Sequence, residues 1–271
     1  MGFIIYSMIT EESVGKLFIA GVIPGLVLAA IFMLIIMFRV MRHPEYAPKA
    51  PVYPMGEKLM SLVKLIPIVI LFVIVVMGIL YGWFTPAEGG ALGAVMALLY
   101  ALVRGRLTLK LFTKTMYNSS LMFGKLFALF VGLYVLQTFL VATRLPNLLA
   151  DFIVGMDISK YAVLVAVIIL YIILGCVMNI MPMMMLTLPS IFPTIQALGF
   201  DGVWFGVVCV IVMEMGMITP PVGMNVFTMA SLAPDIPMAS IFKGVLPFFA
   251  GMLLCVALVV MFPQLALFLA N

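Results

Sequence analysis

The residues best suited to chemistry lie where apolar segments are interrupted. One interruption is the run Gly216–Gly223, with the sequence GMITPPVG. Its prolines, Pro220 and Pro221, remove backbone donors and clash with the preceding turn, so we expect the helix to unwind there. An unwound backbone at membrane depth is costly unless it is buried in protein or lines a cavity. In secondary transporters the freed carbonyls and helix ends hold ions and anionic groups, whereas a simple proline kink is the alternative interpretation.

A second interruption, Gly175–Pro182, divides another apolar run. We expect a re-entrant hairpin over residues 161–198, with its tip facing the broken helix at 203–233. Glu214 is the one acidic residue deep within an apolar run. Intramembrane carboxylates usually face a polar cavity and mark an ion path. The alternative for Glu214 is a buried carboxyl group that is neutral or hydrogen-bonded to the backbone.

Composition places these interruptions in a membrane. Hydrophobic residues make up 66% of the 271 residues and charged residues 9%, against roughly a quarter charged in soluble domains. We therefore expect an all-α integral membrane protein with several spans. No aromatic and basic platform for nucleic acid is evident, and an enzyme would need a nucleophile–base pair or metal cluster within the spans. The single histidine, His43, has no second ligand nearby, so no transition-metal site is expected.

The order of apolar and polar stretches predicts an organisation along the chain. It comprises the end of a first repeat (1–38), a cytoplasmic linker (39–64), scaffold helices (65–142), a periplasmic arm (143–160), a transport part (161–233) and a last transmembrane helix (241–269). Lysine and arginine cluster in residues 39–64 and 104–125, which the positive-inside rule places in the cytoplasm. Within the second cluster, residues 104–119 are amphipathic and are expected along the membrane interface.

The final third of the chain echoes its opening. Residues 2–8 (GFIIYSM) parallel residues 223–229 (GMNVFTM), and residues 21–24 (GVIP) parallel residues 244–247 (GVLP). The spans that follow are expected to run in opposite directions, which is typical of inverted repeats. The second copy follows a proline break, and the first copy begins at the equivalent of Gly223. We therefore expect a C-terminal portion of a longer transporter, without the first repeat's hairpin and broken helix.

Four sequence blocks carry a family resemblance. They are GMITPPVGMN (216–225), ITEESVGKLFIAGVIPG (9–25), FTPAEGGALGA (84–94) and LGFD (198–201). In this order they resemble the large membrane subunit (DctM-type permease) of tripartite ATP-independent periplasmic (TRAP) transporters. The resemblance implies an elevator-type permease of the bacterial inner membrane, not an enzyme, that takes up carboxylates such as C4-dicarboxylates or sialic acid. A non-transporting remnant or membrane scaffold is the alternative.

The resemblance also implies partners and ligands. The partners are a small four-helix membrane subunit, a periplasmic solute-binding protein and the missing N-terminal repeat, all within or at the lipid bilayer and without nucleic acid. Uptake is driven by sodium as the coupling ion, without another cofactor. The implied sodium ligands are oxygens of Gly175, Gly216, Thr219 and Val222. The candidate substrate-binding residues are Asn179 and Asn225.

Overall fold

Helices form every regular element in the part of the chain that the structure describes. The computed structural model describes residues 2–47, 54–63, 65–144, 148, 155, 159–232 and 235–270. The chain divides into two compact units, one of residues 1–43 with 132–271 and the other of residues 44–131. The expected periplasmic arm, 143–160, lies largely outside the described residues. The all-α architecture predicted from the sequence is confirmed within these ranges.

The unit of residues 44–131 centres on a helical hairpin. Its elements are η1 (Pro44–Tyr46), α4 (Met55–Val63), α5 (Ile66–Leu80), α6 (Pro86–Val103) and the first part of α7 (Leu109–Ala142). The α5–α6 turn is tight because Gly78 lets the Phe84 ring occupy the space that a Cβ would need. Thr85 and Glu88 close the start of α6 with a reciprocal capping box.

Two expectations for this unit need correction. The linker expected at 39–64 includes the helix α4, whose nine residues contain no proline. The basic segment expected along the interface at 104–119 is, from Leu109 onward, only the first part of the 34-residue helix α7, whose apolar second part continues to Ala142. No glycine or proline turn signal separates the two parts, so the helix continues from charged into apolar sequence.

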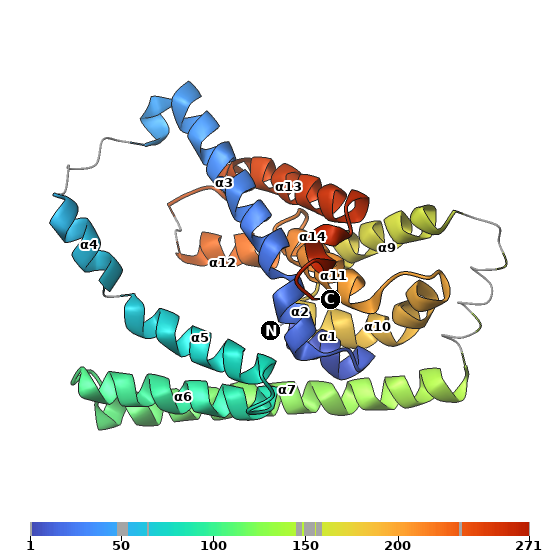
Figure 1. Ribbon diagram of the computed structural model, residues 1–271, viewed down its shortest axis with the longest axis horizontal. Helices are drawn as coiled ribbons and strands as arrows, with labels where there is room; N and C mark the ends of the chain where they lie inside the picture. The colour runs from blue at the N-terminus through green and yellow to red at the C-terminus, as the bar shows by residue number, and fades with distance from the viewer. Residues whose placement is uncertain are drawn as a thin grey trace. The chain divides into compact units, whose positions relative to one another are not determined.

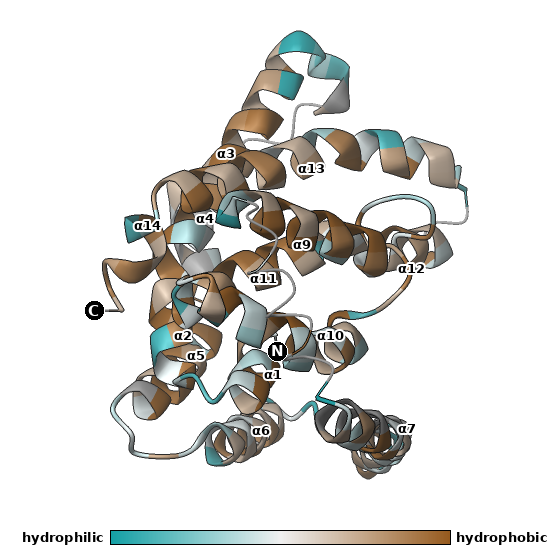
Figure 2. Ribbon diagram, turned by 90° about the vertical axis from the view of Figure 1, so that its right-hand side faces the viewer, coloured by the Kyte–Doolittle hydropathy of each residue, from teal (hydrophilic) through white to brown (hydrophobic). Residues whose placement is uncertain are grey.

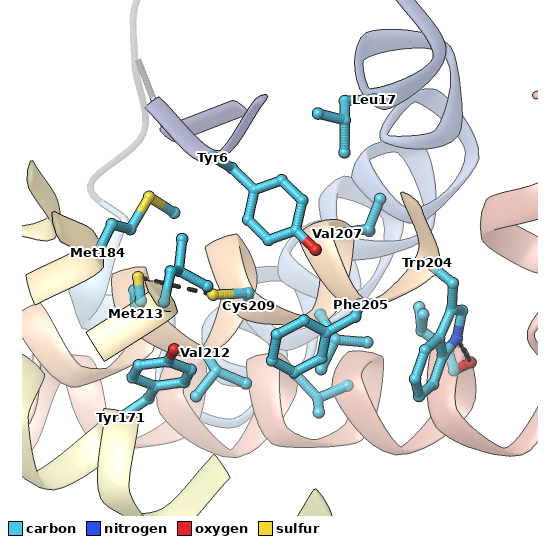
Figure 3. Packing of buried hydrophobic residues seen from close by; sticks show 14 of the residues in the cluster. Tyr6, Leu17, Tyr171, Met184, Trp204, Phe205, Val207, Cys209, Val212 and Met213 are labelled. Atoms are coloured by element: carbon cyan, nitrogen blue, oxygen red, sulfur yellow. Dashed lines mark hydrogen bonds between the residues drawn. The ribbon is translucent and has the colours of Figure 1, made fainter. Parts of the chain in front are cut away.

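The larger unit is built around the buried helix α11. Its helices are α1 (Gly2–Thr10), α2 (Val14–Ala20), α3 (Val22–Arg42), α9 (Lys160–Gly175), α10 (Ile180–Ala197), α11 (Gly202–Met217), α12 (Met224–Leu232), α13 (Met238–Met261) and α14 (Gln264–Leu267). Tyr6 from α1 and Tyr171 from α9 both enter the core beside α11, where Phe205 and Cys209 are buried (Figure 3). The Tyr6 hydroxyl donates to the carbonyl of Gly202 at 2.6 Å, which ties α1 to the start of α11.

The helices α3 and α13, which begin near the two GV(I/L)P motifs, pack against each other in opposite directions (Figure 1). Near the end of α3, Arg39 Nη1 donates to the carbonyl of Gly244 at 2.9 Å, early in α13. Near the start of α3, the carbonyl of Pro24 accepts from Cys255 Sγ at 3.7 Å, late in α13. The helices that carry the parallel segments 2–8 and 223–229, α1 and α12, are each nine residues long. This antiparallel arrangement is the relation expected of inverted repeats.

Hydropathy marks the elements that can cross a membrane. Among the described residues, four helical stretches are long and apolar enough: Val14–Arg42, Pro86–Val103, Ile180–Ala197 and Met238–Met261. Figure 2 shows hydrophobic ribbon along much of α3 and hydrophilic residues at its far end, where Arg39 and Arg42 occupy the last turn. Shorter apolar helices, such as α9 and α11, accompany these spans. The interrupted helices therefore belong to an apolar, membrane-embedded unit.

Candidate functional site

The two interruptions predicted from the sequence are breaks between helices in the structure. The chain leaves α9 at Gly175 and enters α10 at Ile180. It leaves α11 at Met217 and enters α12 at Met224, with Pro220 and Pro221 between them. Each break frees backbone groups that an intact helix would satisfy internally.

The two breaks touch each other through glycines. A Cβ built on Gly216 would lie 2.7 Å from the Cα of Gly175, and one on Gly175 would lie 2.8 Å from the Cα of Gly216. Real side chains do not tolerate such separations, so the backbones approach this closely only because both residues lack a Cβ. The amide of Gly223 also donates to the carbonyl of Cys176 at 3.2 Å. The hairpin tip and the broken helix are thus joined directly.

Backbone and hydroxyl oxygens are concentrated along the α11 break. The Gly216 carbonyl accepts from the amide of Thr219 at 2.9 Å. The Thr219 hydroxyl donates to the carbonyl of Met215 at 2.7 Å. Because the hydroxyl proton is used in that bond, the lone pairs of the Thr219 oxygen remain available to a cation. Hard alkali cations prefer such oxygen ligands.

Val222 occupies a different position from the other three predicted sodium ligands. Its carbonyl belongs to the same peptide unit as the Gly223 amide, which points at Cys176. In a trans peptide the C=O and N–H groups point in opposite directions, so the Val222 carbonyl points away from Cys176. The structure therefore brings Gly175, Gly216 and Thr219 close along the two breaks and places Val222 at the far end of the α11 break.

The candidate substrate residues flank the breaks. Asn179 is the N-cap residue of α10, but its side chain makes no capping hydrogen bond and is exposed. Asn225 is the second residue of α12 and is also exposed. Both amide groups are therefore open to a polar ligand, each at the start of a helix where backbone N–H groups favour anions.

Glu214 lies one turn before the α11 break. Its side chain is exposed, whereas those of its neighbours Met213 and Met215 are fully buried. The carboxyl group therefore lies outside the tightly packed core of α11. A role of Glu214 in an ion path stays a prediction.

A second polar cluster was not anticipated from the sequence. Between α1 and α2, the Glu12 carboxylate occupies the space that a Cβ on Gly202 would need. Burial, with the negative charge of Asp201 adding to it, raises the pKa of the Glu12 carboxyl, while Lys16 opposes the rise. Asp201 caps α11 by accepting from the amide of Trp204 at 2.8 Å. One feature of the sequence could have indicated this cluster: Glu12 and Asp201 both lie in blocks that carry the family resemblance.

Comparison with known proteins decides the family. The family model for the tripartite ATP-independent periplasmic transporter, DctM component, matches residues 1–265. The C4-dicarboxylate TRAP transporter large permease protein DctM of Pseudomonas aeruginosa is 32% identical over 99% of this chain. The chain belongs to the DctM family of TRAP transporter permeases.

Two further relatives of this DctM-family chain are named for sialic acid instead of C4-dicarboxylate. The sialic acid TRAP transporter large permease protein SiaM of Vibrio cholerae is 30% identical over 98% of this chain. The sialic acid permease SiaT of Haemophilus influenzae is 29% identical over 99% of it. This chain spans 62% of the length of DctM, 62% of SiaM and 43% of SiaT.

Membership confirms several predictions. DctM-family proteins are transport permeases and not enzymes, and they are proteins of the bacterial inner membrane. The apolar helices of this chain agree with that location. Both helix breaks and the α11 core lie within the residues that the DctM model matches.

Proposed function

We propose that this chain forms the ion-binding part of a sodium-coupled, elevator-type permease for small carboxylate solutes. A periplasmic binding protein delivers the solute, and a small four-helix membrane subunit accompanies the permease. The observation that carries the proposal is the direct contact between the two breaks at Gly175 and Gly216. A discontinuous helix against a hairpin tip is the arrangement with which secondary transporters bind coupling ions and anionic groups.

The class of solute is supported by the relatives. Their names specify C4-dicarboxylate and sialic acid, both of which carry a carboxylate at neutral pH. In this chain, Asn179 and Asn225 offer amide groups at the starts of α10 and α12. Helix N-termini favour negative charge, so these positions suit a carboxylate. The sodium ion is bound by oxygens of Gly175, Gly216 and Thr219, and Val222 is the fourth proposed ligand, from the far end of the α11 break.

Sodium-dependent uptake into liposomes tests the proposal. The chain is reconstituted with the small subunit, a loaded binding protein and a segment homologous to the part of the relatives that it does not span. Thr219→Val removes a ligand oxygen at nearly constant volume, whereas Thr219→Ser keeps it. We expect Thr219→Val to raise the sodium concentration for half-maximal uptake about ten-fold, the equivalent of one lost interaction of about 1.4 kcal/mol. Thr219→Ser should stay close to the original protein.

Thr228→Val is the matched control. The Thr228 hydroxyl also donates to a carbonyl four residues earlier, that of Met224 at 2.9 Å, but it lies within α12 and outside the break. Copurification with the small subunit monitors assembly separately. An unchanged sodium response in Thr219→Val, with intact assembly, would place the ion elsewhere. If uptake by the unaltered protein did not depend on sodium, sodium coupling itself would be refuted.

A further inference from the structure

A small cavity lies where four helix ends meet in the larger unit. The start of α9, the loop before α11, the end of α13 and the short helix α14 surround a space of about 210 Å³. This volume is below the roughly 300–1,000 Å³ of pockets that enclose whole drug-sized ligands. It suits a group of about ten heavy atoms, such as a lipid head group whose tails remain outside.

One positive and one negative side chain line this cavity. The Lys160 ammonium lies 5.6 Å from the ring centroid of Tyr161 and 5.2 Å from that of Phe200. Asp201 uses Oδ1 to cap α11, which leaves Oδ2 outside that bond. The cavity therefore presents a cation and a carboxylate together, so it favours a ligand that carries both charges.

The remaining lining is aromatic and apolar. The rings of Phe200 and Trp204 stack with centroids 5.3 Å apart, and the Trp204 indole N–H donates to the carbonyl of Val259 at 2.9 Å. Tryptophan and tyrosine are typical of the membrane–water boundary, where one side of the ring is apolar and the other meets polar groups. Val260 and Leu267 add apolar surface on the side of α13 and α14.

We propose that this cavity binds the head group of a zwitterionic phospholipid that carries a primary ammonium. The lipid phosphate lies against Lys160, and the ammonium donates to the free oxygen of Asp201. The glycerol backbone of the lipid lies against Val260 and Leu267. The acyl chains extend from there along the apolar surface into the bilayer. A purely anionic lipid lacks the group that the Asp201 carboxylate requires and is repelled by it.

Lipid titration of the delipidated full chain in detergent tests this site. Dioleoyl phosphatidylethanolamine and dioleoyl phosphatidylglycerol have the same acyl chains and differ only in the head group. We expect the ethanolamine lipid to form a one-to-one adduct in native mass spectrometry and to raise the melting temperature. The glycerol lipid should bind about ten-fold more weakly, as for one lost charged hydrogen bond.

Two substitutions separate the charges. Lys160→Gln alters an exposed side chain, and Asp201→Asn keeps an N-cap acceptor because asparagine caps helices as well as aspartate. Each should weaken binding of the ethanolamine lipid about ten-fold. Asp201→Asn should also reduce the difference in affinity between the ethanolamine lipid and the glycerol lipid. Lys243→Gln, an exposed lysine near the other end of α13, is the control and should change nothing. Equal binding of both lipids by the original chain, or unchanged affinity in both variants, would overturn the proposal.

Discussion

At the scale of single residues, the candidate site depends on the absence of side chains. Gly175 and Gly216 let two backbones touch, and Gly223 adopts a φ of +55°, which L side chains rarely adopt. These glycines do not bind anything through a side chain. They allow the peptide oxygens of the two breaks to come close. Replacing them by larger residues should strain the backbone.

Replacing Gly216 by alanine should destabilise the larger unit. The added Cβ would meet the Gly175 backbone, which cannot move aside as a flexible side chain can. We expect a loss of about 1–3 kcal/mol in the free energy of unfolding, typical of overpacking. Denaturation in detergent, followed by circular dichroism, measures it. Gly124→Ala in α7 is the control, because nothing lies within 4 Å of a Cβ there. Equal stability of the two variants would contradict the close contact.

At the scale of elements, the proposed function depends on a helix that stops at Met217 and restarts at Met224. The apolar sequence on both sides of Pro220 and Pro221 favours helix, and only the segment between Met217 and Met224 departs from it. The length of the break sets which carbonyls are free. The hydrogen bond between Gly223 and Cys176 then ties the end of the break to the hairpin tip.

Replacing both prolines by alanine should favour a continuous helix through this segment. Each proline disfavours a helix interior by about 3 kcal/mol relative to alanine, so the double change removes most of the local bias against helix. In a continuous helix the carbonyls of this segment accept from backbone N–H groups four residues later and are withdrawn from the ion. We expect the sodium concentration for half-maximal uptake to rise about ten-fold or more in the liposome assay. Pro247→Ala, inside α13, should leave the sodium response intact. If the double variant kept a normal sodium dependence of uptake, the α11 break would not be needed for sodium binding.

At the scale of the whole molecule, the distribution of basic residues sets the orientation. The α6–α7 turn carries Arg104 and Arg106, and the linker after α3 follows Arg39 and Arg42. Short cytoplasmic loops are enriched in such residues. We therefore expect the start of α9 and the start of α11 on the periplasmic side.

Cysteine labelling tests this orientation. A membrane-impermeant maleimide applied to intact cells should label Ser159→Cys, at the exposed N-cap of α9, and should spare Arg106→Cys until the cells are permeabilised. The native cysteines Cys176, Cys209 and Cys255 are buried and provide a low background. Labelling of position 106 in intact cells, with position 159 protected, would show that the chain has the opposite orientation in the membrane.

Composition and short motifs were enough to predict the membrane class, the family and the positions of both helix breaks. These properties follow from composition, from motifs and from proline and glycine signals, all of which act within one segment. Three pairings could not be predicted in this way and depend on the packing of helices. Gly175 contacts Gly216, Glu12 lies against Gly202, and Lys160 and Asp201 line one cavity. Such pairs are distant along the chain, and their contacts depend on how side-chain volumes fill the space between helices. Periodicity within one helix carries no information about that packing.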